Sequence, residues 1–142
     1  EVIKICFEEL ILHNIDLKGI ILKPNMILAG ASSGKKILSE EVAKLTLKCL
    51  KESVPTDVPG VAFLSGGQTE VEATENLNLI NKHNDTNFIM TYSYGRALQQ
   101  SALKSWSKNI KDIQNTQKIF NHRANMCTLA AQAKWSEKLE KK

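Results

Sequence analysis

The sequence has few of the residues that mark several common protein classes. In 142 residues it holds three cysteines, three prolines, two tryptophans and two tyrosines. No run approaches the roughly 20 consecutive apolar residues that a membrane-spanning helix needs. No secretory signal pattern stands at the start. The composition therefore predicts a cytoplasmic protein with no membrane partner.

The cysteines and histidines offer no metal or disulfide pattern. The cysteines are odd in number, lie far apart and form no CxxC pair: Cys6, Cys49 and Cys127. Such spacing favours buried free thiols in a reducing compartment. The histidines are equally scattered, and each is expected on the surface or in a loop: His13, His83 and His122. We expect neither a metal site nor a cofactor.

The charge does not indicate nucleic-acid binding. The formal net charge is +4, but no aromatic residue is interleaved with a basic run, and this interleaving is what nucleic-acid binders typically show. Lysines are concentrated toward the end of the chain, at Lys134, Lys138, Lys141 and Lys142. We expect the terminal residues 138–142 to form a solvated, fraying helix end. The basic excess is consistent with a solvated surface and with a local site for an anionic substrate.

The remaining composition is that of a globular protein, with 42% hydrophobic and 24% charged residues. We expect one domain over residues 1–142. Short apolar runs with β-branched residues alternate with segments of helical periodicity, which predicts the order α-β-α-β-α-β-α-α and an α/β fold with a parallel sheet. The predicted buried strands cover residues 19–22, 61–64 and 88–92.

Two helix starts are predicted from capping residues. Ser39 is expected to cap the helix that ends before Pro55, and Glu40 and Glu41 favour the first turn of that helix. Thr69 and Glu72 have the spacing of a capping box.

A polar cluster follows each predicted strand. These clusters are Lys23, Ser65-Gly66-Gly67 and Ser93-Tyr94-Gly95-Arg96. The carboxyl ends of parallel strands meet at one edge, where α/β proteins bind ligands. The sequence therefore predicts one site built from all three clusters.

Each cluster has a chemical reading and a structural alternative. A lysine among apolar neighbours loses solvation, which favours the neutral amine that attacks a carbonyl to form an imine; the alternative for Lys23 is an ammonium that extends to solvent. Glycine loops before helices bring N–H groups close to an anion, and the Arg96 guanidinium suits a phosphate. The alternative is that the glycines only form tight turns. No carboxylate pair stands at a strand end to act as general acid or base.

The three clusters together resemble a known family. Ile21-Leu22-Lys23-Pro24-Asn25-Met26, Phe63-Leu64-Ser65-Gly66-Gly67-Gln68 and Ser93-Tyr94-Gly95-Arg96-Ala97-Leu98-Gln99 are similar, in order and spacing, to motifs of class I, Schiff-base-forming fructose-bisphosphate aldolases. The likeness runs over nearly the whole chain. After Met26, Ile27-Leu28-Ala29-Gly30 differs from the usual Val-Thr-Pro-Gly of that family.

The resemblance implies a fold and an activity. The family folds as a (β/α)8 barrel, usually forms a homotetramer, and uses no metal to cleave fructose 1,6-bisphosphate reversibly into dihydroxyacetone phosphate and glyceraldehyde 3-phosphate in glycolysis. By this likeness Lys23 would form the imine with the ketone. Ser65, Gly66, Gly95 and Arg96 would hold the ketose phosphate, and Ser93 would line the site.

The same resemblance implies an incomplete catalyst. The predicted strands would correspond to the last three of the barrel, without the earlier strands and the catalytic carboxylates and lysines that they carry. We expect the chain alone to be inactive, to expose the apolar faces meant for the missing part, and to aggregate or assemble with copies or a partner. The alternatives are a non-catalytic phosphate-binding module and a vestigial aldolase-like protein that keeps only family surfaces.

Overall fold

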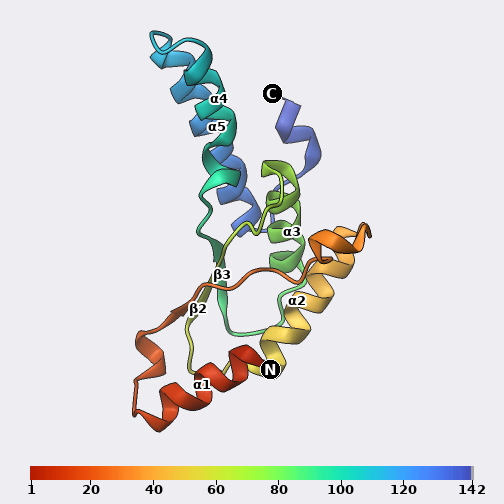
Figure 1. The fold of residues 1–142 in the computed structure, drawn as a ribbon, viewed down its shortest axis with the longest axis vertical. Helices are drawn as coiled ribbons and strands as arrows, with labels where there is room; N and C mark the ends of the chain where they lie inside the picture. The colour runs from red at the N-terminus through yellow and green to blue at the C-terminus, as the bar shows by residue number, and fades with distance from the viewer. Residues whose placement is uncertain (142) are drawn as a thin grey trace.

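The computed structural model describes residues 1–141, apart from the side chain of Ala31. Helices and strands alternate in the predicted order, with three short 3₁₀ helices (η) added (Figure 1). The elements are α1 Val2–Leu12, η1 Leu17–Gly19, β1 Ile21–Leu22, η2 Ala31–Ser33, α2 Ser39–Ser53, β2 Gly60–Phe63, α3 Glu70–Lys82, β3 Ile89–Tyr92, α4 Arg96–Lys108, α5 Ile113–Ala131 and η3 Glu137–Lys141.

The three strands form one parallel sheet in the order β1-β2-β3, which confirms the predicted parallel α/β arrangement. The central strand pairs on both sides. Ile21 lies opposite Gly60 on one side, and Ile89 lies opposite Gly60 on the other. Because all strands point the same way, their carboxyl ends lie along a single edge.

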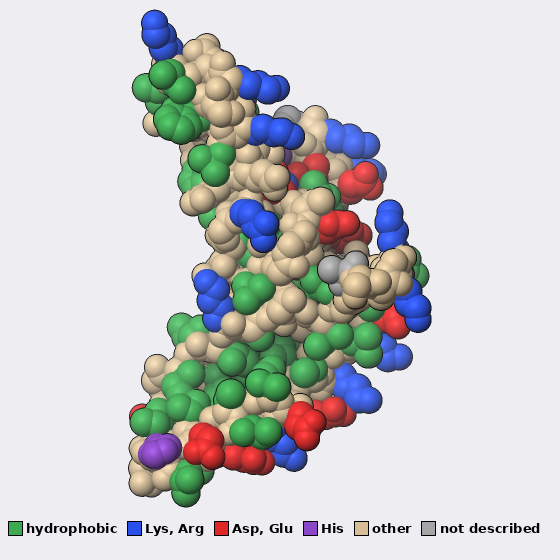
Figure 2. All heavy atoms as spheres, in the orientation of Figure 1, with side chains coloured by type: hydrophobic (Ala, Val, Ile, Leu, Met, Phe, Trp, Pro, Cys, Tyr) green, Lys and Arg blue, Asp and Glu red, His purple; other side chains and the backbone are tan. Residues whose placement is uncertain are grey.

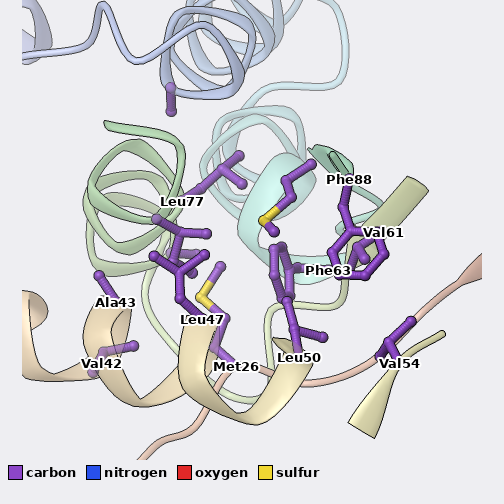
Figure 3. Packing of buried hydrophobic residues seen from close by; sticks show 14 of the residues in the cluster. Met26, Val42, Ala43, Leu47, Leu50, Val54, Val61, Phe63, Leu77 and Phe88 are labelled. Carbon is purple, nitrogen blue, oxygen red and sulfur yellow. The ribbon is translucent and has the colours of Figure 1, made fainter. Parts of the chain in front are cut away.

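One face of the sheet is covered by helices. Side chains of β2 point toward α2 and α3, and the hydrophobic core lies between them (Figure 3). Val61 and Phe63 from β2 are fully buried there, against residues such as Leu50 and Leu77. This alternation follows from the strand period of two, which sends every second side chain of β2 into the core.

The opposite face of the sheet is open. Ile21 and Ile89, which flank Gly60 in the register, are 67% and 74% exposed. The prediction that residues 19–22 form a buried strand is therefore wrong: β1 is an edge strand, and the described chain supplies no layer over this face. Apolar side chains also gather over α1 and the neighbouring strands in the lower half of Figure 2. Exposed members on α1 are Val2, Ile5, Ile11 and Leu12.

The starts of α2 and α3 differ in how they are capped. Thr69 accepts a hydrogen bond from the Glu72 N–H, and the Glu72 carboxylate accepts one from the Thr69 N–H, so the predicted capping box is confirmed. Ser39 is not the cap of α2. The Leu38 carbonyl accepts the first helical hydrogen bonds, so Leu38 is the cap residue and Ser39 already belongs to the helix.

The carboxyl-terminal segment is held down, contrary to the prediction of a fraying end. The Arg123 guanidinium, on α5, donates to both carboxylate oxygens of Glu140 at 2.9 and 2.8 Å. The Trp135 indole donates to the same carboxylate at 2.7 Å. The Arg123 contacts join residues 17 apart in sequence, which a local pattern does not show. Lys142, the last lysine of the expected fraying end, lies outside the described residues.

The cysteines are not all buried as predicted. Cys127 is buried, Cys49 is partly exposed and Cys6 is exposed. Cys6 faces outward because α1 packs on the rest of the structure through another side, where Phe7 is the buried residue.

Candidate active site

The register of the sheet brings the three predicted clusters to one edge. Beyond the strands, the Leu64 N–H donates to the Pro24 carbonyl at 3.0 Å and the Ser93 N–H donates to the Phe63 carbonyl at 2.8 Å. These bonds continue the parallel ladder past β1, β2 and β3 into the segments that follow. The segments that carry Lys23, Ser65 and Ser93 therefore lie along one edge of the sheet, as predicted.

Lys23 is exposed in this structure. It follows Ile21 by two positions on an edge strand, so the alternation of the strand places it on the open face of the sheet. Of the two alternatives for Lys23, the described chain shows the one in which the side chain extends to solvent, because it supplies no cover for that face. The position of Lys23 at the end of the strand agrees with the prediction.

The segment after β2 makes a tight turn. The Gln68 N–H donates to the Ser65 carbonyl at 3.0 Å, and the two central residues, Gly66 and Gly67, have φ of 55° and 85°. Positive φ at both central positions is the backbone of a type I′ turn, for which glycine is the favoured residue. A Cβ at Gly66 would lie 2.7 Å from Cγ of Asn25. The Lys23 segment and the Ser65 turn are thus packed directly against each other.

The segment after β3 is anchored by a tyrosine. Tyr94 is 7% exposed, and its hydroxyl donates to the Ala73 carbonyl of α3 at 2.8 Å. Burial raises the pKa of the Tyr94 hydroxyl well above its ordinary value, so the group stays a neutral donor. Tyr94 therefore fixes the backbone on either side of it, and Ser93, Gly95 and Arg96 remain exposed at the edge.

The two helix starts at this edge differ in their ability to attract an anion. The first turn of α3 contains Glu70 and Glu72, and its N–H groups are partly used by the capping box. The first turn of α4 contains no acidic residue, its cap Gly95 makes no side-chain hydrogen bond, and Arg96 is its first residue. Free N–H groups beside a guanidinium favour an anion. The expectation for the Arg96 loop is therefore better supported than that for the start of α3.

The carboxylates closest in sequence to the turn have partners elsewhere. Glu70 accepts a hydrogen bond from the Ser101 N–H at 2.8 Å and another from the Ser101 hydroxyl. The Thr69 N–H holds the pKa of Glu72 below its ordinary value. Neither carboxylate is therefore placed by this structure as a general acid or base for Lys23.

Metal binding and membrane spanning are two other properties that the described residues could indicate. In residues 1–141 no three His, Cys, Asp or Glu side chains are grouped so that they could hold a metal ion. Of the helices the structure describes, none is both long and apolar enough to cross a membrane. The histidines lie apart, and His83 contacts Glu40 at 2.9 Å on the surface.

Sequence reasoning missed the contacts that hold this edge in place. Asn25, Gln68 and Tyr94 were noted only as parts of motifs, without a role of their own. Each contacts a segment remote in sequence, so spacing alone could not reveal its partner. The available signal is that each lies within two residues of a candidate site residue.

Comparisons with known proteins agree with this arrangement. The family model for class-I fructose-bisphosphate aldolase matches residues 1–142. The chain is 47% identical over 124 residues to the cytosolic fructose-bisphosphate aldolase 4 of Arabidopsis thaliana, covering 87% of this chain and 32% of the relative. It is 40% identical over 136 residues to the fructose-bisphosphate aldolase of Dictyostelium discoideum, covering 96% of this chain and 38% of the relative.

A solved structure shows the same fold. The fructose-bisphosphate aldolase of Plasmodium falciparum, crystallised in a ternary complex with TRAP and a small-molecule inhibitor, superposes with a TM-score of 0.90 at 38% identity. The match covers 95% of this chain and 39% of that one. The chain thus spans about a third of the length of the curated relatives it matches. With its motifs in order at one sheet edge and the family model matched from end to end, this chain belongs to the class-I fructose-bisphosphate aldolase family.

Proposed function

We propose that this chain supplies the imine-forming lysine and the ketose-phosphate site of a fructose-bisphosphate aldolase, as the last three strands of a (β/α)8 barrel. The observation that carries the proposal is the continued ladder that brings Lys23, Ser65 and Ser93 to one sheet edge. The substrate is fructose 1,6-bisphosphate, and the products are dihydroxyacetone phosphate and glyceraldehyde 3-phosphate. The relatives named above are aldolases of this substrate class.

In the proposed chemistry, the neutral amine of Lys23 adds to the substrate ketone and water leaves, which forms an imine. Once protonated, the imine nitrogen accepts the electron pair of the breaking carbon–carbon bond. No metal is needed, because the iminium carries the positive charge that a Lewis acid would otherwise supply.

The phosphate of the bound ketose is held by groups from two loops. The Ser65 turn offers its hydroxyl and the N–H of Gly66, and the start of α4 offers the N–H of Gly95 and the guanidinium of Arg96. Ser93 lines the space between them. Charge-assisted hydrogen bonds from a guanidinium are among the stronger contacts to phosphate.

The chain by itself does not complete the reaction in this proposal. Glu70 and Glu72, the carboxylates closest in sequence to the Ser65 turn, are held by Ser101 and Thr69, and the sheet face on which Lys23 stands is open. Turnover needs a proton donor and acceptor and a layer over that face. We propose that this layer comes from further polypeptide or from assembly in a homo-oligomer, a tetramer as in the family, in the cytoplasm.

The exposure of Lys23 also favours a second candidate, a phosphate-binding module that forms no imine. Exposure leaves Lys23 without the apolar neighbours from which imine formation was predicted. This candidate retains the Ser65 and Arg96 loops as a binding site, and it differs from the first only at Lys23.

Titration of the ¹⁵N-labelled chain with fructose 1,6-bisphosphate tests the phosphate site. We expect shifts of the Gly66 and Gly95 amide resonances that saturate, and that are weakened at least about tenfold by Arg96→Gln, the scale expected for a charged hydrogen bond. Lys108→Gln, at the other end of α4, is the matched control. Absence of saturable shifts in the folded chain would leave only the vestigial alternative.

A further inference from the structure

The Gln68 side chain connects three segments at the candidate site. Its amide nitrogen donates to the Ser65 carbonyl at 2.8 Å and lies 3.6 Å from the Met26 sulfur. Its amide oxygen accepts a hydrogen bond from the Asn76 side chain at 2.6 Å. The turn after β2, the segment after Lys23 and helix α3 therefore meet at this one side chain.

The two outer partners of Gln68 are fixed in the core. Met26 is 2% exposed and Asn76 is 5% exposed. The backbone after Met26 is fixed as well, because the Ile27 N–H donates to the buried Thr46 hydroxyl at 3.0 Å. By contrast, Gly66 and Gly67 are exposed and lack side chains that could pack. A glycine turn has much conformational freedom to lose, and Gln68 provides the link from the turn to rigid surroundings.

The same helix holds the other loop of the site. Asn76 binds Gln68, and Ala73, three residues earlier on α3, accepts the hydrogen bond of Tyr94. Residues three apart lie on the same side of a helix. The first turns of α3 thus set the position of the Ser65 turn and of the Arg96 loop relative to each other.

We propose that Gln68 is a positioning residue for phosphate binding, and that it acts by holding the Ser65 carbonyl so that the Ser65 hydroxyl and the Gly66 N–H face the same ligand as Arg96. Gln68 itself does not contact the phosphate. This inference rests on the proposed phosphate site. Its signature is a loss of affinity that comes from loosening of the turn, without general loss of stability.

The test compares Gln68→Met with Gln100→Met in the full chain. Methionine keeps the length of glutamine and removes both the donor and the acceptor, and Gln100 is an exposed glutamine of α4. The backbone N–H of residue 68 closes the turn by donating to the Ser65 carbonyl. We expect this backbone hydrogen to exchange at least about tenfold faster in the Gln68→Met chain. We expect the dissociation constant for inorganic phosphate to rise about fivefold to tenfold, the range for one ordering hydrogen bond. In the Gln68→Met chain, hydrogen exchange in β2 and α3 should be unchanged. In the Gln100→Met chain, neither the exchange of the Gln68 backbone amide nor the dissociation constant for phosphate should change.

Three results would overturn parts of this assignment separately. Unchanged phosphate affinity in Gln68→Met, with or without faster exchange, would show that the side chain has only a structural role. Faster exchange throughout α3 would show general destabilisation. No phosphate binding by the unsubstituted chain would overturn the phosphate site itself, and the role of Gln68 with it. If Gln68→Met does not fold, Gln68→Leu serves instead, because leucine also lacks the donor to Ser65 and adds no charge beside the phosphate site.

Discussion

Arg123 and Glu140 form a two-point ion pair that fastens the end of the chain to α5. Both terminal nitrogens of the guanidinium contact the carboxylate, and one of them also donates to the Thr74 hydroxyl of α3 at 2.9 Å. The side chains are 5% and 13% exposed. This bidentate geometry fixes the relative orientation of the two side chains and strengthens their contact. Through the one guanidinium of Arg123, η3 is bound to both α3 and α5.

Removing one partner of this pair should release the segment after α5. Glu140→Gln leaves a buried guanidinium without its counter-charge, and we expect a loss of about 2–3 kcal/mol in the free energy of unfolding. Chemical denaturation in a Trp106→Phe background, with Trp135 as the fluorescent reporter, measures this loss. Glu137→Gln, an exposed residue of the same segment, is the control and should change little. Equal stability of Glu140→Gln and the control would contradict the role of the pair.

The same pair should make the end of the chain sensitive to acid. Burial would raise the pKa of Glu140, but hydrogen bonds from Arg123 and Trp135 outweigh burial and hold it below the ordinary value of 4.5. A lowered folded-state pKa gives stability that is complete above the unfolded-state pKa and is lost as pH falls through the folded value. We therefore expect Trp135 fluorescence to report release of the segment only below about pH 4.5. A Glu140→Gln chain that shows the same acid transition would contradict this assignment.

Gly66 should not tolerate a side chain. Its φ is 55°, and a Cβ would collide with the side chain of Asn25. We expect Gly66→Ala to destabilise the fold by about 1–3 kcal/mol and to abolish phosphate binding, because the turn must open. Gly19→Ala is the matched control, since a Cβ there meets no neighbouring atom. Adding Asn25→Ala to Gly66→Ala should recover part of the lost free energy of unfolding, because it removes the collision but leaves the backbone strain. Normal phosphate affinity of Gly66→Ala would show that the turn does not contact the ligand.

The open face of the sheet should drive association. Ile89 is 74% exposed, across Gly60 from the exposed Ile21, and an uncovered apolar sheet face favours association. Sedimentation velocity should show association that increases with concentration, and Ile89→Lys should shift the chain toward monomer. Ile113→Lys, at the start of α5, is the control for an exposed isoleucine away from the sheet. A monodisperse, cooperatively unfolding monomer before any substitution would contradict this expectation.

The order of elements could be predicted because its signals are local. Helical and strand periods, the Thr69 and Glu72 capping box, and the stop of α2 before Pro55 each depend on residues close in sequence. The parallel arrangement then followed from the alternation of helices and strands, and it placed Lys23 and the two glycine loops at one edge.

The features that could not be predicted depend on distant partners. An apolar run such as residues 19–22 has the same pattern whether or not another layer covers it, so the exposure of Ile21 was not foreseeable. The ion pair of Arg123 with Glu140 and the link from Gln68 to Asn76 join elements whose relative placement no spacing rule specifies. Ser39 is a favourable cap by residue type, but the cap of α2 is one residue earlier, at Leu38, and Ser39 is the first residue of the helix.

Covalent trapping tests whether Lys23 forms an imine with the substrate ketone. The chain is incubated with fructose 1,6-bisphosphate and borohydride, which reduces an imine to a stable amine, and the intact mass and the modified peptide are then determined. We expect a single adduct on Lys23 that is lost in Lys23→Ala, is retained in Lys18→Ala, and forms without release of cleavage products. A folded chain that gives no adduct, or one whose adducts are spread evenly over its lysines, would contradict the assignment of Lys23 as the imine-forming residue.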